Sequence, residues 1–594
     1  MKTEEKDKEY LGNLRHSCAH LLAAAVWELW PKAKRTIGPA IENGFYFDFD
    51  FGDTKISEDD LRKIEVKMHE LVKEWCAFKE IKLTKAESIN EYPDNGYKHE
   101  LIEEFSKGDE LLSFYESVNK DGKGLYKDLC KGGHIEKPDK ELKHFKLLSV
   151  AGAYWRGSEK NKMLTRIYGT AFPSQKELTD YLESVEEAKK RDHRKLAKEL
   201  DLIVFSEIVG GGLPLYTPKG ALVRSLMFNF SRELNKKIGY TETALPSVNR
   251  AELFKISGHY DKYREDMFLV KSHYSEEEYY LKPMNCPQHC VLFGSKTRSY
   301  KDLPIRYSDF SVLYRDERPG EINGLFRSRS FTQDDGHCFC TEDQVEGEFA
   351  NVMDAVDEAL KGYGFGNYCI RLSLRDPNHP EKYLGDEGVW KRAEARLEKI
   401  VKSKAVKYVE GLGEAAIYGP KLDFMVKDSL NREWQISTVQ LDMIMAKRFG
   451  LSYSDEKGKQ VTPLMVHRAI IGSERFMAIL IEHFSGAFPL WLSPIQVKVL
   501  PITDRNTAYA NKLGEDMKNQ NLRVEVDERS QTLGAKIRDA QAEKVPYLLV
   551  VGDREVAENK VAVRVRSGKD VGNMDIAKFI KYVKNKEETK SLEL

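Results

Sequence analysis

Two pairs of side chains with the same four-residue spacing stand in the first quarter of the chain. The segment LRHSCAH holds His16 and His20, and DLCKGGH holds Cys130 and His134. Residues at i and i+4 lie on one face of a helix, so both imidazoles of the first pair can reach a common point. Ser17 stands where a metalloprotease of the HExxH type has its glutamate.

Imidazole and thiolate groups support two kinds of chemistry at such a place. Together they could bind zinc in tetrahedral geometry, or they could position a water and polarise an ester without a metal. Each pair alone also fits buried, hydrogen-bonded histidines and an inert thiol. The presence of two pairs favours a functional site.

The middle of the chain holds candidate binders of phosphate. Arg315 lies in YRDERPG, Arg327 follows it, and Arg475 lies at a predicted helix start in VHRAIIGSERF. Guanidinium forks match phosphate oxygens, so three such residues suit a triphosphate, although surface salt bridges would use the same residue type.

The same region offers a second set of metal-ligand types. Cys286 in PMNCPQHC, His337 in FTQDDGHCF and His467 in VHRAIIGSERF would give zinc three protein ligands and leave a fourth place for substrate. Their separations are too irregular to form a metal motif by themselves.

These residues must be positioned by several folding units, because 594 residues exceed what one core supports. GFYFDFDF predicts a strand, and a capping box at Ser57 followed by Leu61, Ile64, Met68, Leu71 and Trp75 predicts a helix. From Ser174 a charged stretch with a sparse apolar stripe predicts one long exposed helix between domains. The stretch VGGGLPLYTPKG then opens a segment of mixed strands and helices. After Pro494, VKVLPI, RVEVD, YLLVVG and VAVRVR predict the strands of a compact α/β unit.

The composition limits the classes of protein. Hydrophobic residues make up 41% and charged residues 32%, with no long apolar run and no leader-like start, so we expect a soluble cytoplasmic protein without membrane contact. Eight cysteines without a C-x-x-C pair indicate reduced thiols. With a net charge of −1, a nucleic-acid partner would have to be held by local basic patches.

Taken in order, these blocks closely resemble the threonyl-tRNA synthetase family of class II aminoacyl-tRNA synthetases. LRHSCAH, NGFYFDF, KDLCKGGH, AGAYWRG and RIYGT resemble its editing domain, and KPMNCP, YRDE, FTQDDGH, YGPKLDF, TVQLD and HRAIIGSERF its catalytic core. The resemblance runs to VPYLLVVGD near the end of the chain. It implies an α+β multidomain protein. The expected parts are an α+β editing domain at 1–173, a linker helix at 174–205, a catalytic domain built on an antiparallel sheet at 206–491, and an α/β anticodon-binding domain at 492–594.

The resemblance also implies roles for residues of the catalytic domain. Arg315 and Glu317 would hold the α-phosphate and adenine end of ATP, Phe331 would stack on adenine, and Arg475 would meet the γ-phosphate, with Mg²⁺ bridging the phosphates. The remaining ATP contacts would be Arg327, Thr438, Gln440 and Ser473. Cys286, His337 and His467 would bind one Zn²⁺ per subunit, which would take threonine through its amino and hydroxyl groups. The further active-site residues implied are Asp335, Tyr418 and Gln440 around threonine, Gln333 and Lys421 beside them, and His259 for the transfer to tRNA.

A second site follows from the limits of that recognition. A zinc ion that demands a hydroxyl rejects valine, whereas serine differs from threonine by one methyl, which is worth only about 1–3 kcal/mol. A hydrolytic pocket for seryl-tRNA is therefore needed. The residues implied for it are His16, His20, Lys98, Asp128, Cys130 and His134. For the anticodon the resemblance implies Lys544, Glu555 and Arg564, while Ser530 stands where a base-reading amide is expected.

The predicted function is ATP-dependent attachment of L-threonine to tRNA(Thr) by a homodimer, with Pro246 in the dimer motif. Two features depart from the family pattern. The usual ubiquitin-like domain ahead of the editing motif is expected to be absent or removed. GSER, 472–475, lacks one residue, and because one residue is a rotation of about 100° on a helix, the preceding loop must absorb the deletion if Arg475 is to reach phosphate.

Two alternatives remain at this stage. A prolyl- or seryl-type synthetase would share the class, but the Cys286, His337 and His467 set argues against it. A regulatory RNA-binding paralogue that has lost activation is made conceivable by the shortened GSER motif, and the presence of Arg315, Glu317, Asp335 and Gln440 argues against that.

Overall fold

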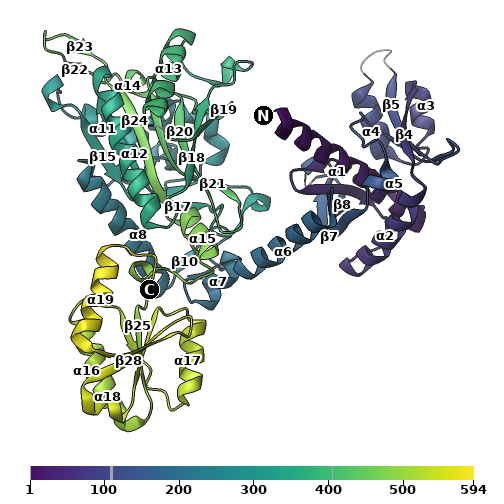
Figure 1. Cartoon of the computed structure of the whole chain (residues 1–594). Coiled ribbons are helices and arrows are strands. Elements are labelled where there is room, and N and C mark those ends of the chain that lie inside the picture. The colour runs from purple at the N-terminus through teal and green to yellow at the C-terminus, as the bar shows by residue number, and fades with distance from the viewer. Residues whose placement is uncertain (1, 107–110, 159, 405) are drawn as a thin grey trace. The chain divides into compact units, whose positions relative to one another are not determined.

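The computed structural model describes residues 2–106, 111–158, 160–404 and 406–594 (Figure 1). The chain divides into two compact units, Met1–Glu186 and Glu187–Leu594. Both units mix helices with mainly antiparallel sheets, which confirms the predicted α+β class. Among the described residues, every helix is too short or too polar to cross a membrane. The bounds of the four predicted domains stay predictions.

The first unit packs a long helix against a sheet with strand order β1-β3-β8-β7, and a second sheet has the order β4-β5-β6. Its helices are α1 (Lys2–Leu29), α2 (Glu58–Leu71), α3 (Lys85–Asn90), α4 (Gly96–Phe105) and α5 (Pro138–Glu141). Its strands are β1 (Lys34–Arg35), β2 (Ala40–Ile41), β3 (Gly44–Asp50), β4 (Ala77–Leu83), β5 (Leu112–Val118), β6 (Gly124–Leu129), β7 (His144–Tyr154) and β8 (Met163–Phe172).

The two elements predicted in this unit are present. β3 is the GFYFDFDF strand, and its alternate residues Phe45, Phe47 and Phe49 are buried in the core that α1 covers. α2 begins after Ser57, whose backbone N–H donates to Asp60 at 3.0 Å. Trp75 is buried but lies beyond the end of α2.

The predicted linker helix is two helices instead of one, α6 (Gln175–Arg191) and α7 (His193–Glu199), followed by strand β9 (Ile203–Val204). Between the helices, Asp192 leaves the helical conformation and caps α7 by accepting from the Arg194 N–H at 2.8 Å. The physical reason is tertiary: the bend lets His193 bury its ring against Glu482.

The second unit is built on a large sheet with strand order β11-β15-β17-β24-β21-β20-β18-β19, with β16 beside β17. Neighbouring strands in it run antiparallel except β11 with β15 and β18 with β19. Helices α8, α12, α13 and α15 contribute to its main hydrophobic core, and α12 runs along the sheet (Figure 1). The helices are α8 (Pro218–Lys237), α9 (Ala251–Ser257), α10 (His259–Tyr263), α11 (Cys286–Gly294), α12 (Val345–Gly362), α13 (Glu387–Ser403), α14 (Met445–Arg448) and α15 (Glu474–His483). The strands of the large sheet are β11 (Thr241–Glu242), β15 (Ile305–Asp309), β16 (Val312–Tyr314), β17 (Ser330–Cys340), β18 (Tyr368–Leu374), β19 (Tyr408–Leu412), β20 (Lys421–Lys427), β21 (Glu433–Asp442) and β24 (Leu464–Gly472). Smaller strands are β10 (Leu215–Tyr216), β12 (Val248–Arg250), β13 (Leu269–Val270), β14 (Tyr279–Leu281), β22 (Tyr453–Ser454) and β23 (Gln460–Val461).

The end of this unit is the α/β part predicted after Pro494, a sheet of order β26-β25-β27-β28-β29. Its strands are β25 (Val497–Pro501), β26 (Val524–Val526), β27 (Tyr547–Val551), β28 (Lys560–Val565) and β29 (Asp570–Asp575). Its helices are α16 (Thr507–Lys518), α17 (Leu533–Ala542), α18 (Asp553–Glu558) and α19 (Ile576–Glu588). Figure 1 shows α17 on one side of this sheet and α16 and α19 on the other. Successive residues of a strand face opposite sides: Leu549 joins the core with α16 and α19, whereas Leu548 joins the core with α17.

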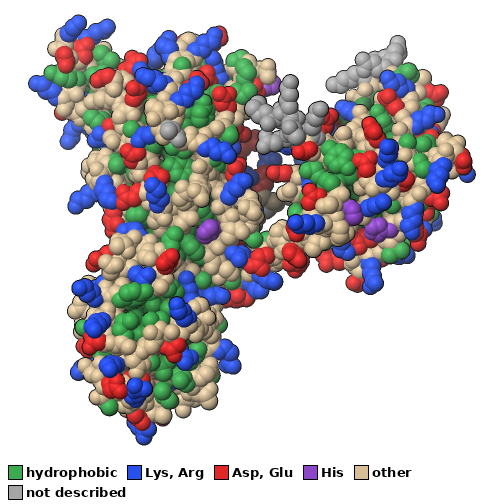
Figure 2. Space-filling view, in the orientation of Figure 1, with side chains coloured by type: hydrophobic (Ala, Val, Ile, Leu, Met, Phe, Trp, Pro, Cys, Tyr) green, Lys and Arg blue, Asp and Glu red, His purple; other side chains and the backbone are tan. Residues whose placement is uncertain are grey.

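Charges of both signs are mixed over the surface. On the face drawn in Figure 2, basic and acidic side chains are interspersed on both units, in keeping with the net charge of −1. A polyanionic partner must therefore be recognised by particular groups of residues and not by an overall field.

Candidate active sites in the two units

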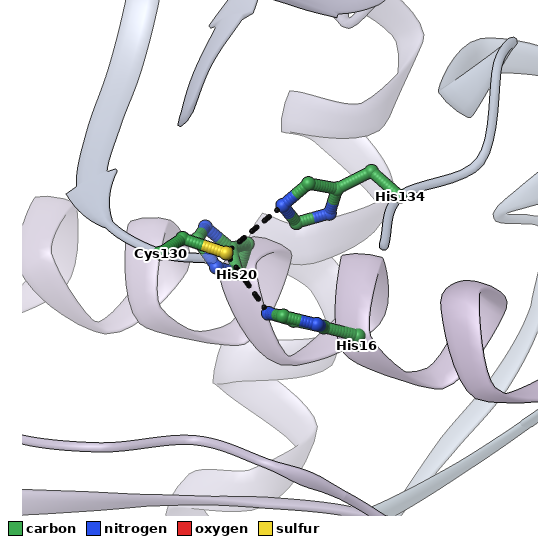
Figure 3. A group of neighbouring side chains, drawn as sticks. All are labelled: His16, His20, Cys130 and His134. Atoms are coloured by element: carbon green, nitrogen blue, oxygen red, sulfur yellow. Dashed lines mark hydrogen bonds between the residues drawn. The ribbon is translucent and has the colours of Figure 1, made fainter. Parts of the chain in front are cut away.

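The two ligand-type pairs of the first unit meet. His16 and His20 lie on α1, Cys130 directly follows β6, and His134 lies in the loop before α5. The Cys130 Sγ atom is 3.3 Å from His16 Nε2 and 3.3 Å from His134 Nε2 (Figure 3). One ligand atom from each of the four residues lies within 4.8 Å of the others. The structure thus brings the two pairs together at one point, and their role there stays a prediction.

Burial keeps this cluster uncharged near neutral pH. It lowers the pKa of His134 to about 3 and raises the pKa of Cys130 to about 11. Burial likewise lowers the pKa of His20 well below its usual value, and the buried Nδ1 of His20 has no hydrogen-bond partner within the described part of the chain. The cluster therefore presents neutral nitrogen acceptors and a thiol.

A buried ion pair adjoins the cluster. Lys98 Nζ is 2.7 Å from Asp128 Oδ1, and Asp128 also accepts from the Tyr126 hydroxyl at 3.1 Å. Although burial alone raises the pKa of Asp128, the charges of Lys98 and Arg35 hold it below its usual value. Asp128 is thus ionised, and the pair keeps the Lys98 ammonium fixed beside the histidines.

A cavity of about 470 Å³ opens onto these groups. Of the six residues predicted for the hydrolytic pocket, all but His134 line this cavity. His134 is hydrogen-bonded to Cys130, which does line it. Apolar walls come from Phe47, Leu101 and Phe105. The cavity is suited to a small acyl group whose ester lies against the polar cluster.

In the second unit, strand register explains why the predicted metal ligands are so far apart in sequence. His337 on β17 pairs directly with His467 on β24, and Cys286 begins α11. All three side chains are buried, and their ligand atoms lie within 4.8 Å of one another.

The two histidines of this group are oriented by partners that sequence reasoning missed. His337 Nδ1 lies 2.6 Å from Nδ1 of His289, and His467 Nε2 lies 2.9 Å from Asp442 Oδ2. These contacts leave His337 Nε2 and His467 Nδ1 as ligand atoms, so with Cys286 the set fits zinc with one open position. His289 and Asp442 could have been found, because they stand inside PMNCPQHC and TVQLD.

Most residues predicted to surround threonine lie beside this group. The Tyr418 ring stacks on His467 with 4.9 Å between ring centroids, and its hydroxyl donates to Gln440 at 2.6 Å. The Asn285 amide donates to Asp335 at 3.1 Å. His259, on α10, is buried and close enough to Asp442 and His467 for their charges to affect its pKa. Lys421 forms an ion pair with Asp423, which also accepts from Thr438 at 2.9 Å.

The predicted ATP residues line a separate cavity of about 200 Å³. Those brought together there are Arg315, Glu317, Arg327, Phe331, Thr438, Ser473 and Arg475. Gln440 is the exception, since its partner is Tyr418 on the side of the metal group. Gln333, predicted as a further active-site residue, lines the same cavity.

Charge in this cavity is mostly positive. Burial lowers the pKa of Arg475, and the nearby charges of Arg315 and Arg327 lower it further. Arg327 is paired with Glu317 at 2.7 Å, and the Arg315 guanidinium lies 5.0 Å from the centre of the Phe331 ring. A polyphosphate would relieve the repulsion among the three arginines.

The shortened GSER motif leaves Arg475 in the cavity. Gln333 pairs with Gly472 and Asp335 pairs with Ala469, so β24 has one residue more than β17 at this point, a β-bulge. Ser473 then leads into α15. This irregular step lies in β24 shortly before the helix, and where the missing residue is absorbed stays a prediction.

The predicted anticodon residues are not gathered. Lys544 precedes β27 and lies beside Phe488 and Glu199, whereas Glu555 follows β27 and caps α18 by accepting from Gly552 at 3.0 Å. Arg564 lies on β28 opposite Leu548 and pairs with Asp570 at 3.7 Å. Lys544 and Glu555 are therefore separated by the length of a strand.

Three family descriptions match successive parts of the chain. Residues 113–168 match the second additional domain of threonyl and alanyl tRNA synthetases, 268–484 the class II tRNA synthetase core domain (G, H, P, S and T), and 496–586 an anticodon binding domain. A large, mainly antiparallel sheet that holds an arginine-lined cavity, together with these matches, defines a class II aminoacyl-tRNA synthetase.

The relatives narrow this class. A threonine–tRNA ligase of Cytophaga hutchinsonii is 48% identical over 581 residues, 97% of this chain and 88% of that protein. One of Thermotoga neapolitana is 44% identical over 583 residues, 98% of this chain and 89% of that protein. The chain belongs to the threonine–tRNA ligase family.

Solved structures agree with this assignment. The RNA binding domain of a threonyl-tRNA synthetase from Cryptosporidium parvum Iowa II has a TM-score of 0.63 at 35% identity, covering 66% of this chain and 98% of that one. A Giardia lamblia prolyl-tRNA synthetase has a TM-score of 0.54 at 18% identity, covering 69% of this chain and 82% of that one, so it shares the fold alone.

Proposed function

We propose that this enzyme joins threonine to tRNA(Thr) through threonyl-adenylate, with zinc at Cys286, His337 and His467. The observation that carries the proposal is that the arginine-lined cavity and the group of metal-ligand residues share a strand. Gln333 and His337 both lie on β17, so the arginine-lined cavity and the metal group are held by one sheet. Nucleotide and amino acid would meet between them.

The first step joins a carboxylate oxygen of threonine to the α-phosphorus of ATP and releases pyrophosphate. Arg315 and Arg475 neutralise the phosphates, and Phe331 holds the adenine, so catalysis is positioning and charge stabilisation. Zinc held by Cys286, His337 and His467 would supply coordination for the amino and hydroxyl groups of threonine. In the second step a ribose hydroxyl of the tRNA attacks the acyl carbon and AMP leaves. We assign His259 to this transfer step.

Exchange of pyrophosphate into ATP tests the first step with threonine, serine and proline in turn. We expect the fastest exchange with threonine, weak exchange with serine and none with proline. Cys286→Ala should lose bound zinc and exchange together, while the protein stays folded by circular dichroism. Exchange with proline alone would favour a prolyl-type synthetase. No exchange with any of the three amino acids would favour the RNA-binding paralogue.

We further propose that the first-unit cavity hydrolyses seryl-tRNA(Thr) without a metal. Water adds to the ester carbon, and the neutral imidazole cluster accepts its proton. The bond to the ribose oxygen then breaks, and that oxygen takes the proton back and leaves as the tRNA hydroxyl, which releases serine. Lys98 and Asp128 fix the charge beside the ester.

Hydrolysis of added seryl-tRNA(Thr) tests this step. The double variant His16→Ala with Cys130→Ala should keep threonine-dependent exchange and lose hydrolysis. Elemental analysis should find one zinc per chain in both proteins. Unchanged hydrolysis, or a second zinc that the variant loses, would contradict the proposal.

The remaining assignments belong to the same proposal. We place Mg²⁺ on the phosphates of ATP, the anticodon on the last α/β part through Lys544, Glu555 and Arg564, and the enzyme in the cytoplasm as a homodimer. The eight cysteines are all free thiols, which supports a reducing compartment. Sedimentation analysis should give twice the chain mass.

A further inference from the structure

His193, at the start of α7, uses both ring nitrogens. Nδ1 lies 2.7 Å from Glu482 Oε1, and Nε2 accepts the backbone N–H of Leu325 at 3.1 Å. Because a backbone N–H can only donate, Nε2 carries no proton and Nδ1–H donates to Glu482. The ring is 1% exposed, so this neutral tautomer is fixed by its partners.

The contact is a link between chain segments and not a metal site. Asp192, His193 and Glu482 are close enough to bind an ion. However, both nitrogens of His193 are engaged, and the second carboxylate oxygen of Glu482 accepts from Arg432. The histidine is therefore committed to joining α15 to the segment at Leu325.

That segment is a wall of the ATP cavity. Gly324 has a φ of +51°, and a Cβ there would lie 2.3 Å from His193 Nε2, so the loop approaches the ring as closely as a glycine allows. Leu325 and Phe326 line the cavity. The Phe326 ring stands edge-on to His193 at 4.5 Å between centroids and stacks on Trp434, also at 4.5 Å.

The loop in turn holds the arginine assigned to the γ-phosphate. Arg475 Nε donates to the Phe326 carbonyl at 3.0 Å. This bond uses the inner nitrogen of the fork. In the part of the chain that the structure describes, the two terminal nitrogens have no hydrogen bond and stay available for phosphate oxygens.

We propose that His193 is a positioning residue for ATP. Its acceptor nitrogen holds the Leu325 N–H, the loop presents the Phe326 carbonyl, and that carbonyl orients Arg475 toward the nucleotide. The proposal rests on the ATP site proposed above. It gives the bend between α6 and α7 a role in adenylate formation, since the bend is what brings His193 to the loop.

Two variants distinguish the hydrogen-bond acceptor of His193 from the space that its side chain fills. In His193→Asn the amide can still donate to Glu482 near the position of Nδ1 but cannot reach Leu325. In His193→Gln the amide oxygen falls near Nε2 and can accept the Leu325 N–H. Leaving one buried N–H unpaired should raise the KM for ATP about 5- to 50-fold in His193→Asn. The KM for threonine should change less than about 2-fold, and His193→Gln should regain most of the loss.

All KM values are measured by pyrophosphate exchange with the full chain, and two further variants serve as controls. Arg191→Ala removes contacts to Ser429 and the His483 carbonyl, near the bend but away from the loop, and should leave both KM values unchanged. Arg475→Ala should raise the KM for ATP. If it does not, the ATP site itself is wrong.

If Arg475→Ala raises the KM for ATP and folded His193→Asn does not, the role of His193 alone is wrong. Equal losses in His193→Asn, His193→Gln and Arg191→Ala would also overturn it, because they would reflect general loosening. Should His193→Asn fail to fold, Gly324→Ala displaces the loop from the ring instead, and an unchanged KM for ATP in that variant would refute the proposal.

Discussion

At the scale of single residues, histidines differ in role according to which of their ring nitrogens already has a hydrogen-bond partner. His337 and His467 each give one nitrogen to a protein partner, and the other nitrogen faces the proposed metal site. His193 gives both and binds nothing else. His20 keeps a buried nitrogen without a partner among the described residues. Only contacts, not residue type, distinguish these roles.

The protonation of His134 leads to a prediction for the hydrolysis of seryl-tRNA. Burial lowers its pKa to about 3, so the neutral, proton-accepting form is fully present from pH 8 down to pH 5.5. The enzymatic rate, corrected for spontaneous hydrolysis, should therefore show no fall between pH 7 and 5.5. An inflection near 6.5, the value of an ordinary histidine, would show that the cluster is solvated and charged.

The partner of His467 leads to a second prediction at this scale. Asp442→Asn keeps the Oδ1 atom that accepts the Ile444 and Met445 N–H groups, but it sets an amide donor against His467 Nε2. The ring must turn, and zinc affinity should fall about 10- to 100-fold, as measured by competition with a chromophoric chelator. Asp455→Asn, in the turn between β22 and β23, is the matched control. Equal zinc affinity in the two variants would rule out the orienting role.

At the scale of elements, strand register and close backbone approach bring together the residues of the proposed activation site. β17, β24 and β21 are neighbours, and their register sets His337 opposite His467 and His467 opposite Gln440. The segment before β20 adds Tyr418 to this group, and Lys421, the first residue of β20, pairs with Gln440. The segment can contribute Tyr418 because Gly419 lies directly against β21.

Gly419→Ala tests that approach. A Cβ at this position would lie 1.7 Å from the Leu441 carbonyl oxygen, which is backbone and cannot move aside easily. The segment should shift, break the Tyr418 to Gln440 hydrogen bond, and raise the KM for threonine at least 10-fold in pyrophosphate exchange. The control is Gly347→Ala in α12, where a Cβ meets nothing within 4 Å. A normal KM for threonine in Gly419→Ala would contradict this account of the site.

At the scale of the whole molecule, each compact unit has its own core and its own candidate site. The cavity proposed for hydrolysis is lined by residues of the first unit, and the cavity proposed for ATP by residues of the second. Ligands of one site should therefore stabilise one unit.

Hydrogen exchange can measure this division. Threonine with a non-hydrolysable ATP analogue, each at about 100 times its Kd, stabilises the unit that binds it by about 2.7 kcal/mol per ligand. Slower amide exchange is expected in residues 187–594, including β17 and β24, and unchanged exchange in α1 and β3. Equal protection of both units would mean that they unfold together.

Much of this protein could be predicted from local sequence. Alternating aromatic residues determined β3, and the apolar strands after Pro494 determined β25 to β28, because a residue's side of a strand depends only on its parity. Helical spacing placed His16 and His20 on one face. The blocks and their order identified the family.

Tertiary structure alone decided the rest. The bend at Asp192 depends on a buried carboxylate about 290 residues away, and the pairing of His337 with His467 depends on strand register. The orientation of those rings depends on His289 and Asp442, and the separation of Lys544 from Glu555 depends on the direction of β27. Local patterns fix periodicity and conformation, whereas contacts between distant segments follow from how the elements pack, which no short stretch of sequence contains.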